Sequence, residues 1–163
     1  MSHYYVYKTG LAWPTISKRV TDRFGTRMGK HEGLDIGPLE RGVEGDSVAA
    51  IADGYVVEKG FRRNNGNYVK LRHGKKEWEF YSLYLHGKNH SIRVNAGDDV
   101  ERGEALMTMG NTGRSTAPHL HLGVKIEHYD VNGIKEIWLD PESLYKKPGS
   151  DKELLLALRK YQR

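Results

Sequence analysis

The sequence predicts a mainly β protein, an antiparallel β-sheet or sandwich that ends in a short α-helix. Short stretches of alternating polar and apolar residues recur between turn signals such as Asp53-Gly54 and Asn132-Gly133. Helical periodicity is confined to the last residues of the chain. A chain of 163 residues fits one domain and buries enough surface to form a core without disulfide bonds.

Eight β-strands are expected, each bounded by turn residues. The first two flank Asp53-Gly54, the third follows the polar stretch 64–67, and the fourth follows the stretch 73–76. The remaining four alternate with further turn signals, among them Asn132-Gly133 before the last one. The expected strands are residues 47–51, 54–59, 68–72, 77–85, 91–94, 105–110, 119–126 and 134–139.

The C-terminal tail is expected to form an amphipathic helix. Ser150 followed three residues later by Glu153 is a capping box, and the cations near the chain end suit the negative end of a helix dipole. An apolar stripe predicts that the helix packs against the β-domain. The stripe consists of Leu154, Leu155, Leu158 and Tyr161. The stretch 146–149 contains Pro and Gly, and it divides a β-domain at 1–147 from a helical tail at 148–163.

The charge and apolar content of the chain limit its partners. The formal net charge is +5 and the pI is about 9.3, which favours a polyanionic partner or surface without identifying which one. The cations are dispersed and form no basic helix, zinc-finger spacing or RNA-binding aromatic signature, so nucleic-acid binding is not expected. No stretch approaches 18 apolar residues, and residues 1–8 lack the features of a secretion signal, so a soluble chain is expected.

Two short histidine-bearing stretches carry the strongest functional signal. His31 and Asp35 are four residues apart and His119 and His121 are two apart, so on a β-strand each pair presents both side chains to one face. Imidazole nitrogen and carboxylate oxygen are ligands of Zn²⁺, and a catalytic zinc usually has three protein ligands and one open position. Because the chain has no cysteine, any zinc must be held by nitrogen and oxygen.

The stretch that begins at His31 also has the His-Glu spacing of helical zinc proteases, in which the glutamate is the base. Glycines at positions 29, 33 and 37, followed by Pro38, argue against a helix, because each interior glycine costs about 1 kcal/mol relative to alanine. Glu32 is therefore expected to be a bystander.

Six blocks of residues occur in order along the chain. They are Arg23-Phe24-Gly25, His31-x-x-x-Asp35, Gly45-Asp46-x-Val48-x-Ala50-x-x-Asp53-Gly54-x-Val56, Tyr84-x-His86, Gly97-Asp98-x-Val100-x-x-Gly103 and Gly110-x-Thr112-Gly113-x-Ser115-x-x-Pro118-His119-Leu120-His121. In this order they resemble the zinc endopeptidases of the LytM/lysostaphin type, the M23 peptidases. The resemblance covers roughly residues 13–145, the whole of a typical catalytic domain of that type.

The resemblance implies one zinc ion per chain, with His31, Asp35 and His121 as its ligands. It assigns His86 and His119 to the histidines beside the metal that handle protons and stabilise developing charge. Imidazole suits both tasks because it titrates near neutral pH. The resemblance assigns the two tasks to these two histidines together and does not say which histidine performs which task.

The segment after His86 is longer than in many relatives and contains His90, which is the alternative for the same role. His86 is preferred, because an aromatic-rich strand precedes it and the residues that follow it form a turn signal. Tyr81 and Tyr84 are close enough to His86 in sequence to be expected in the wall of a substrate cleft.

The resemblance implies an enzyme that hydrolyses peptide cross-links of bacterial peptidoglycan. It is expected to work as a monomer at the cell wall, in the periplasm or outside the cell, as a processed secreted protein or a phage-type lysin. The alternative is a LytM-like regulator that activates another wall hydrolase, but such regulators have lost zinc ligands and all five polar positions are present here. A biotinyl or lipoyl carrier is excluded, because no lysine occurs between Arg93 and Arg114.

Overall fold

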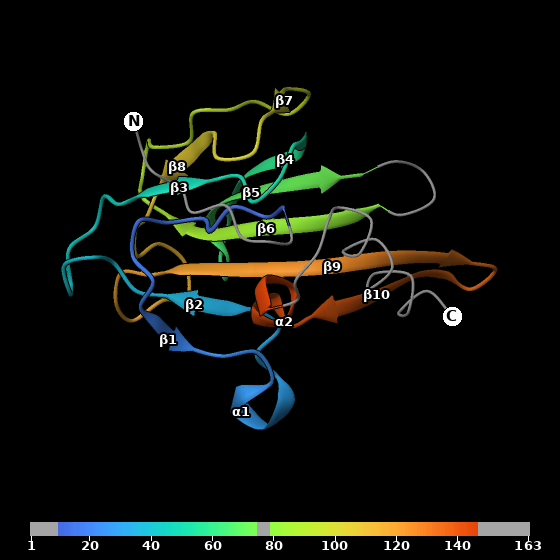
Figure 1. The fold of residues 1–163 in the computed structure, drawn as a ribbon, viewed down its shortest axis with the longest axis horizontal. Helices are drawn as coiled ribbons and strands as arrows, with labels where there is room; N and C mark the ends of the chain where they lie inside the picture. Colours follow the sequence, from blue (N-terminus) through green and yellow to red (C-terminus); the bar gives the residue numbers. More distant parts are fainter. Residues whose placement is uncertain (1–9, 75–78, 147–163) are drawn as a thin grey trace.

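The computed structural model describes residues 10–74 and 79–146, and these residues form ten β-strands and two short helical segments (Figure 1). The mainly antiparallel β class expected from the sequence is confirmed. In chain order the elements are β1 Val20–Asp22, α1 Thr26–Gly29, β2 Leu34–Ile36, β3 Ser47–Ala49, β4 Gly54–Arg62, β5 Gly66–His73, β6 Phe80–Gly87, β7 Asp99–Val100, β8 Ala105–Thr108, β9 Leu120–Asp130, β10 Gly133–Leu139 and α2 Pro141–Lys146.

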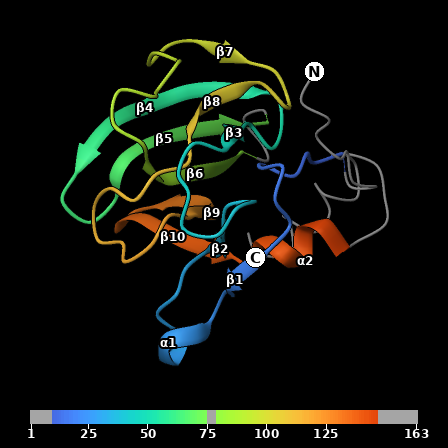
Figure 2. The ribbon, with the colours of Figure 1, turned by 90° about the vertical axis from the view of Figure 1, so that its left-hand side faces the viewer.

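Strand β9 is the centre of the large sheet, whose strand order is β1-β2-β9-β6-β5-β4-β7. Along one edge β9 pairs first with β2 and then with β10, and along the other edge it pairs with β6. Strands β3 and β8 form a separate two-stranded sheet that lies against one side of the large sheet (Figure 2). No helix among the described residues has the length and apolar character needed to cross a membrane.

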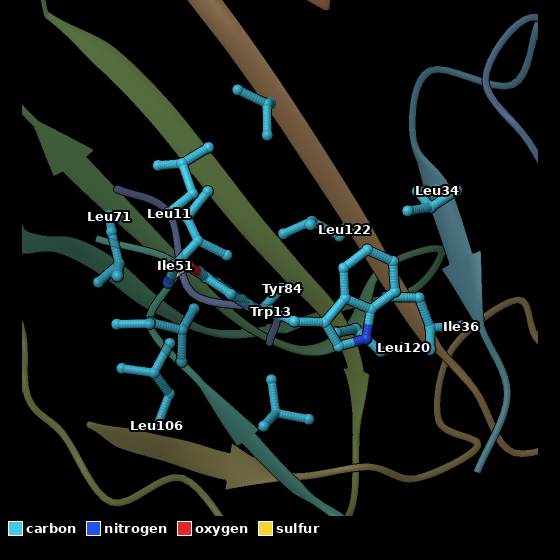
Figure 3. Close-up of a cluster of buried hydrophobic side chains, with 14 of the residues drawn as sticks. Leu11, Trp13, Leu34, Ile36, Ile51, Leu71, Tyr84, Leu106, Leu120 and Leu122 are labelled. Atoms are coloured by element: carbon cyan, nitrogen blue, oxygen red, sulfur yellow. Dashed lines mark hydrogen bonds between the residues drawn. The ribbon is translucent and has the colours of Figure 1, made fainter. Parts of the chain in front are cut away.

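The hydrophobic core fills the space between the large sheet and the β3–β8 pair. Leu34, Leu122 and Tyr84 stand side by side in the ladder on β2, β9 and β6, and all three are fully buried (Figure 3). Val48 and Leu106 contribute to the same cluster from the small sheet. Burial of each large aliphatic side chain contributes about 1.5–3 kcal/mol, so this face of the sheet provides most of the driving force for folding.

The segment before β1 closes the core against α2. The rings of Trp13 and Tyr145 meet edge to face with centroids 5.1 Å apart, and the Tyr145 hydroxyl donates a hydrogen bond to the Ala12 carbonyl at 2.8 Å. Trp13 is therefore a core residue.

The expected strand at 91–94 is wrong. This segment makes a single cross-strand backbone bond, from the Arg93 N–H to the Leu106 carbonyl at 2.8 Å, and no repeating ladder. Strand β8 pairs with β3 instead. The eight expected strands do not include β1, β2 or β7, and the sequence does not indicate α1 or α2, because these elements are too short to show a period. A strand at Asp35 is indicated only by the spacing of His31 and Asp35. The predicted helix in the tail 148–163, and with it the proposed domain boundary, lies outside the described residues.

The expectation that Tyr84 lines a substrate cleft is also wrong. Its ring is fully buried in the core, and its hydroxyl accepts a hydrogen bond from the Ile51 N–H at 2.9 Å. Alternate residues of a strand point to opposite faces, and in β6 the face that carries Ser82 and Tyr84 is the core face.

A buried polar network continues from Tyr84 to His73. The Ser82 hydroxyl is 3.0 Å from the Tyr84 hydroxyl and 2.6 Å from His73 Nε2, and His73 Nδ1–H donates to the Asp53 carbonyl at 2.8 Å. Burial lowers the pKa of His73 to about 4, because a charged imidazole at this position would have no contact with water.

This network predicts a pH-dependent stability. Between pH 6.5 and about 4 the unfolded chain binds a proton at His73 and the folded chain does not, so the free energy of unfolding should fall as the pH falls through that range. The full effect is about 3 kcal/mol. Chemical denaturation of metal-free protein at pH 7 and pH 4.5 should show a smaller difference for His73→Gln than for the parent. His128→Gln, a change at an exposed histidine, should retain the parental difference.

Candidate metal centre

The register of three strands places the candidate metal ligands on the face of the sheet opposite the core. Asp35 of β2 lies directly opposite His121 of β9, and His121 lies directly opposite Leu85 of β6. The neighbouring pair, Leu34 and Leu122, faces the core. Because side chains alternate along a strand, the same pairing that builds the core projects Asp35 and His121 to the other side.

The structure brings His31, Asp35 and His121 together. Asp35 Oδ1 is 3.1 Å from His31 Nε2 and 2.8 Å from His121 Nδ1, and these two ring nitrogens are 3.3 Å apart. His31 precedes β2 in a loop, so the expected strand geometry applies to Asp35 and His121 but not to His31.

Backbone carbonyls fix the orientation of three imidazoles around this cluster. His31 Nδ1–H donates to the Arg23 carbonyl at 2.7 Å, His86 Nδ1–H to the Thr112 carbonyl at 2.8 Å, and His119 Nδ1–H to the Ala117 carbonyl at 2.8 Å. A carbonyl accepts only from a protonated ring nitrogen, so in each neutral imidazole Nε2 keeps its lone pair.

His121 is oriented differently, because its ring packs on Gly33. A Cβ atom at position 33 would lie 2.4 Å from His121 Nε2 and 2.8 Å from the Leu122 carbonyl oxygen. Only glycine leaves room for the ring here, and with Nε2 against the backbone, Nδ1 is the atom that faces Asp35. The sequence indicated Gly33 only as a residue that disfavours a helix.

The two oxygens of Asp35 have different partners. Oδ1 faces the histidines, whereas Oδ2 accepts a hydrogen bond from Arg27 Nη2 at 3.0 Å. Burial opposes ionisation of Asp35, but the hydrogen bond with His121 and the charges of the surrounding histidines lower its pKa to about 2. Asp35 is therefore ionised at neutral pH, with one oxygen directed into the cluster.

Arg27 reaches Asp35 from an unusual backbone conformation. Its φ angle is 56° and that of Met28 is 58°, so α1 is a left-handed turn over these residues rather than a regular helix. A non-glycine residue in this conformation costs about 1 kcal/mol or more. The side chain is held on its other side by Asp22, whose Oδ2 accepts from Arg27 Nε at 2.9 Å.

The donor set fits a zinc ion. Zinc with ligand distances of about 2.0–2.1 Å and tetrahedral geometry places its ligand atoms about 3.3 Å apart, close to the separations in this cluster. Two imidazole nitrogens and a carboxylate oxygen suit zinc, and the fixed Nδ1–H of His31 and the Arg27–Asp35 pair provide the outer contacts that such ligands require. Among the described residues this is the group with metal-binding geometry.

His86 and His119 stand beside this cluster. Their ring centroids are 4.7 Å apart, and His119 Nε2 is 3.8 Å from Asp35 Oδ1. Burial, aided by the nearby charge of His119, lowers the pKa of His86 to about 4, so its imidazole is neutral at pH 7. The alternative, His90, is exposed in the turn after β6.

A β-bulge directs His86 to the site. Between Tyr84 and Gly87, β6 contains one residue more than the opposite stretch of β5 from Val69 to Asn67. His86 has a left-handed φ angle of 66° at this irregularity. Regular alternation would place its ring on the core face with Tyr84, and the bulge turns it toward His119 instead.

The other candidate residues lie outside the centre. Glu32 is exposed and does not belong to the group with metal-binding geometry, in agreement with its expected role as a bystander. Tyr81 lies opposite Lys125 in the ladder, on the same face as His121 but only 7% exposed, with Lys70 Nζ 4.6 Å from its ring centroid. A role for Tyr81 in substrate binding stays a prediction.

The amino-acid sequence of this chain is similar to a known peptidase family and to proteins that act on bacterial peptidoglycan or activate its hydrolysis. The family model for peptidase family M23 matches residues 29–133. The murein hydrolase activator NlpD of Escherichia coli is 33% identical over 124 residues, which cover 76% of this chain and 30% of that protein. The peptidoglycan DD-endopeptidase ShyC of Vibrio cholerae is 32% identical over 136 residues, which cover 78% of this chain and 28% of that protein.

The fold is also that of a solved structure, the antimicrobial peptidase lysostaphin from Staphylococcus simulans. The TM-score is 0.62 at 27% identity, over 80% of this chain and 50% of that chain. The chain spans between 25% and 30% of the length of the curated relatives that it matches.

The contact between Arg27 and Asp35 predicts an effect on metal affinity. Loss of an outer contact to a metal ligand typically costs 10–100-fold, so Arg27→Gln should weaken zinc binding by roughly that factor in a chelator competition assay. Lys30→Gln is the matched control, because Lys30 is an exposed cation in the same loop that forms no ion pair with the described residues. Asp35→Ala removes a candidate ligand and should weaken zinc binding far more than Arg27→Gln does. Parental affinity in Arg27→Gln would show that Arg27 does not orient the carboxylate.

Proposed function

The chain belongs to peptidase family M23, and we propose that it is a zinc-dependent endopeptidase that hydrolyses peptide cross-links of bacterial peptidoglycan. The observation that carries this proposal is the convergence of five side chains on one face of the sheet: His31, Asp35, His121, His86 and His119. All five come from a single chain, which supports a site that is complete in a monomer and holds one zinc ion.

The proposed roles follow from the contacts of each residue. His31, Asp35 and His121 would hold zinc, which when bound supplies a Lewis acid and lowers the pKa of coordinated water to about 7. His86 and His119 do not belong to the ligand triad. Each has an Nδ1–H anchored on a backbone carbonyl, which leaves its Nε2 atom to bind or transfer a proton.

Peptide hydrolysis needs these two imidazoles for two tasks. The carbonyl oxygen gains negative charge when the carbonyl carbon becomes tetrahedral, and the leaving amine must receive a proton. An imidazole that takes the proton released by the attacking water at its Nε2 atom becomes a cation, and its Nε2–H can then stabilise that charge or pass its proton to the leaving amine. The short distance between the rings of His86 and His119 supports a division of these tasks around a single scissile bond.

A second candidate function is regulation of another wall hydrolase. The similarity to the activator NlpD favours it, whereas the similarity to the endopeptidase ShyC favours catalysis. We favour the enzyme, because a regulator has no use for a complete zinc donor set with two oriented imidazoles beside it. Either function places the protein at the cell wall, where its formal net charge of +5 would favour contact with anionic wall polymers.

Replacement of His119 by alanine separates the two functions. The variant should keep its zinc, because the three ligands remain, but lose hydrolysis of purified peptidoglycan by 10²–10⁴-fold, the usual contribution of a positioned acid or base. Zinc content and release of soluble wall fragments are measured on the same preparation.

His90→Ala is the matched control, an exposed histidine outside the cluster, and should retain both zinc and activity. Equal digestion by parent and His119→Ala would exclude a catalytic role for His119. If the parent digests no wall but stimulates a separate hydrolase, the regulator is the correct assignment.

A further inference from the structure

A cavity of about 430 Å³ opens beside the candidate metal centre, and three arginines are among the residues that line it. Asp35 and His119 form part of its wall, so whatever occupies the cavity lies next to the proposed reacting bond. The arginines are Arg19, Arg27 and Arg41. They come from the segment before β1, from α1 and from the loop after β2, three parts of the chain that meet only in the folded structure.

Only one of these three arginines has its charge balanced by carboxylates of the described residues. Arg27 is paired with both Asp22 and Asp35. Arg19 and Arg41, in contrast, form no ion pair with any of the residues that the structure describes. Asp35 would also share its charge with zinc, so the cavity as a whole carries excess positive charge.

Arg19 is held in place although it has no acidic partner. Its Nη2 donates to the Pro38 carbonyl at 2.9 Å, and its guanidinium packs so closely on Gly37 that a Cβ atom there would lie 2.6 Å from Nη2. A guanidinium that is already ordered loses little further entropy when it binds a ligand. Arg41 is exposed at the same cavity and completes a pair of available cations.

We propose that this cavity binds a free carboxylate carried by the peptide substrate close to the scissile bond. The inference rests on the proposed peptidase function and narrows its substrate class: cross-linked D-amino-acid stems that carry a free carboxylate, rather than uncharged glycine bridges. The planar fork of a guanidinium matches a carboxylate in geometry and charge. A singly charged group suits the site better than a phosphate, because the carboxylates of Asp22 and Asp35 line the same cavity.

The test uses a D-alanine-containing cross-linked peptide in two forms, with a free carboxylate or a carboxamide on the residue next to the scissile bond. Zinc-loaded parent should hydrolyse the free acid with a kcat/KM at least about tenfold above that of the amide, the usual effect of a charge-assisted hydrogen bond. Arg41→Gln should lower kcat/KM for the acid by about tenfold and leave the amide unchanged. Arg41→Lys, which keeps the charge, should retain part of the preference.

Arg93→Gln is the matched control, a change at an exposed arginine outside the cavity, and should behave as the parent. Binding is measured separately by calorimetry, with a linear peptide acid and its amide that lack the scissile bond and therefore cannot be cleaved. The parent should bind the acid more tightly, and Arg41→Gln should lose that difference.

The two readouts distinguish the two proposals. Selective binding of the acid without hydrolysis of either cross-linked peptide would remove the peptidase function and retain the carboxylate site. Hydrolysis of acid and amide at equal rates would overturn the carboxylate site and retain the peptidase. Equal binding of the two linear peptides would also overturn the carboxylate site, whatever the hydrolysis assay shows. Faster cleavage of pentaglycine than of the free acid would overturn the proposed substrate class.

Discussion

The pairing register of β9 with β2 and β6 is the constraint on which the rest of the structure depends. Leu34, Leu122 and Tyr84 align on the core face, so the adjacent positions, Asp35 and His121, must project to the opposite face. A shift by one residue would expose the leucines and bury the carboxylate in the core. The hydrophobic energy of the core therefore also sets the geometry of the candidate metal centre.

Asp35 connects the candidate metal centre to the adjoining cavity, because it belongs to both. One of its oxygens faces the histidines and the other binds Arg27, whose left-handed backbone is held by pairing with Asp22. A locally unfavourable conformation is stable here because two carboxylates and one guanidinium satisfy each other. Such conformations concentrate at functional sites, where the surrounding contacts determine them.

The candidate metal centre and the adjoining cavity have different electrostatic environments. At the candidate metal centre, burial keeps His86 neutral and a carboxylate remains ionised among imidazoles. In the adjoining cavity, Arg19 and Arg41 have no acidic partner among the described residues. Together, the centre and the cavity support a site in which the cavity holds one part of a peptide by its charge while another part reacts at the candidate metal centre. The same arrangement would explain selectivity for a charged peptide in a fold that occurs both in wall endopeptidases and in an activator.

The sequence by itself determined the fold class and most of the long strands, and the resemblance of its six blocks identified the residues that meet at the candidate metal centre. Alternating apolar residues and short-range spacing such as His119-Leu120-His121 depend only on strand geometry, which a linear pattern records. Only the tertiary structure decided that His86 turns out of the core at a β-bulge, that Gly33 makes room for His121, that Arg27 holds Asp35, and that Tyr84 lies in the core. These features depend on contacts between segments far apart in the chain, or on a single extra residue in a ladder, and neither leaves a periodic signal in the sequence.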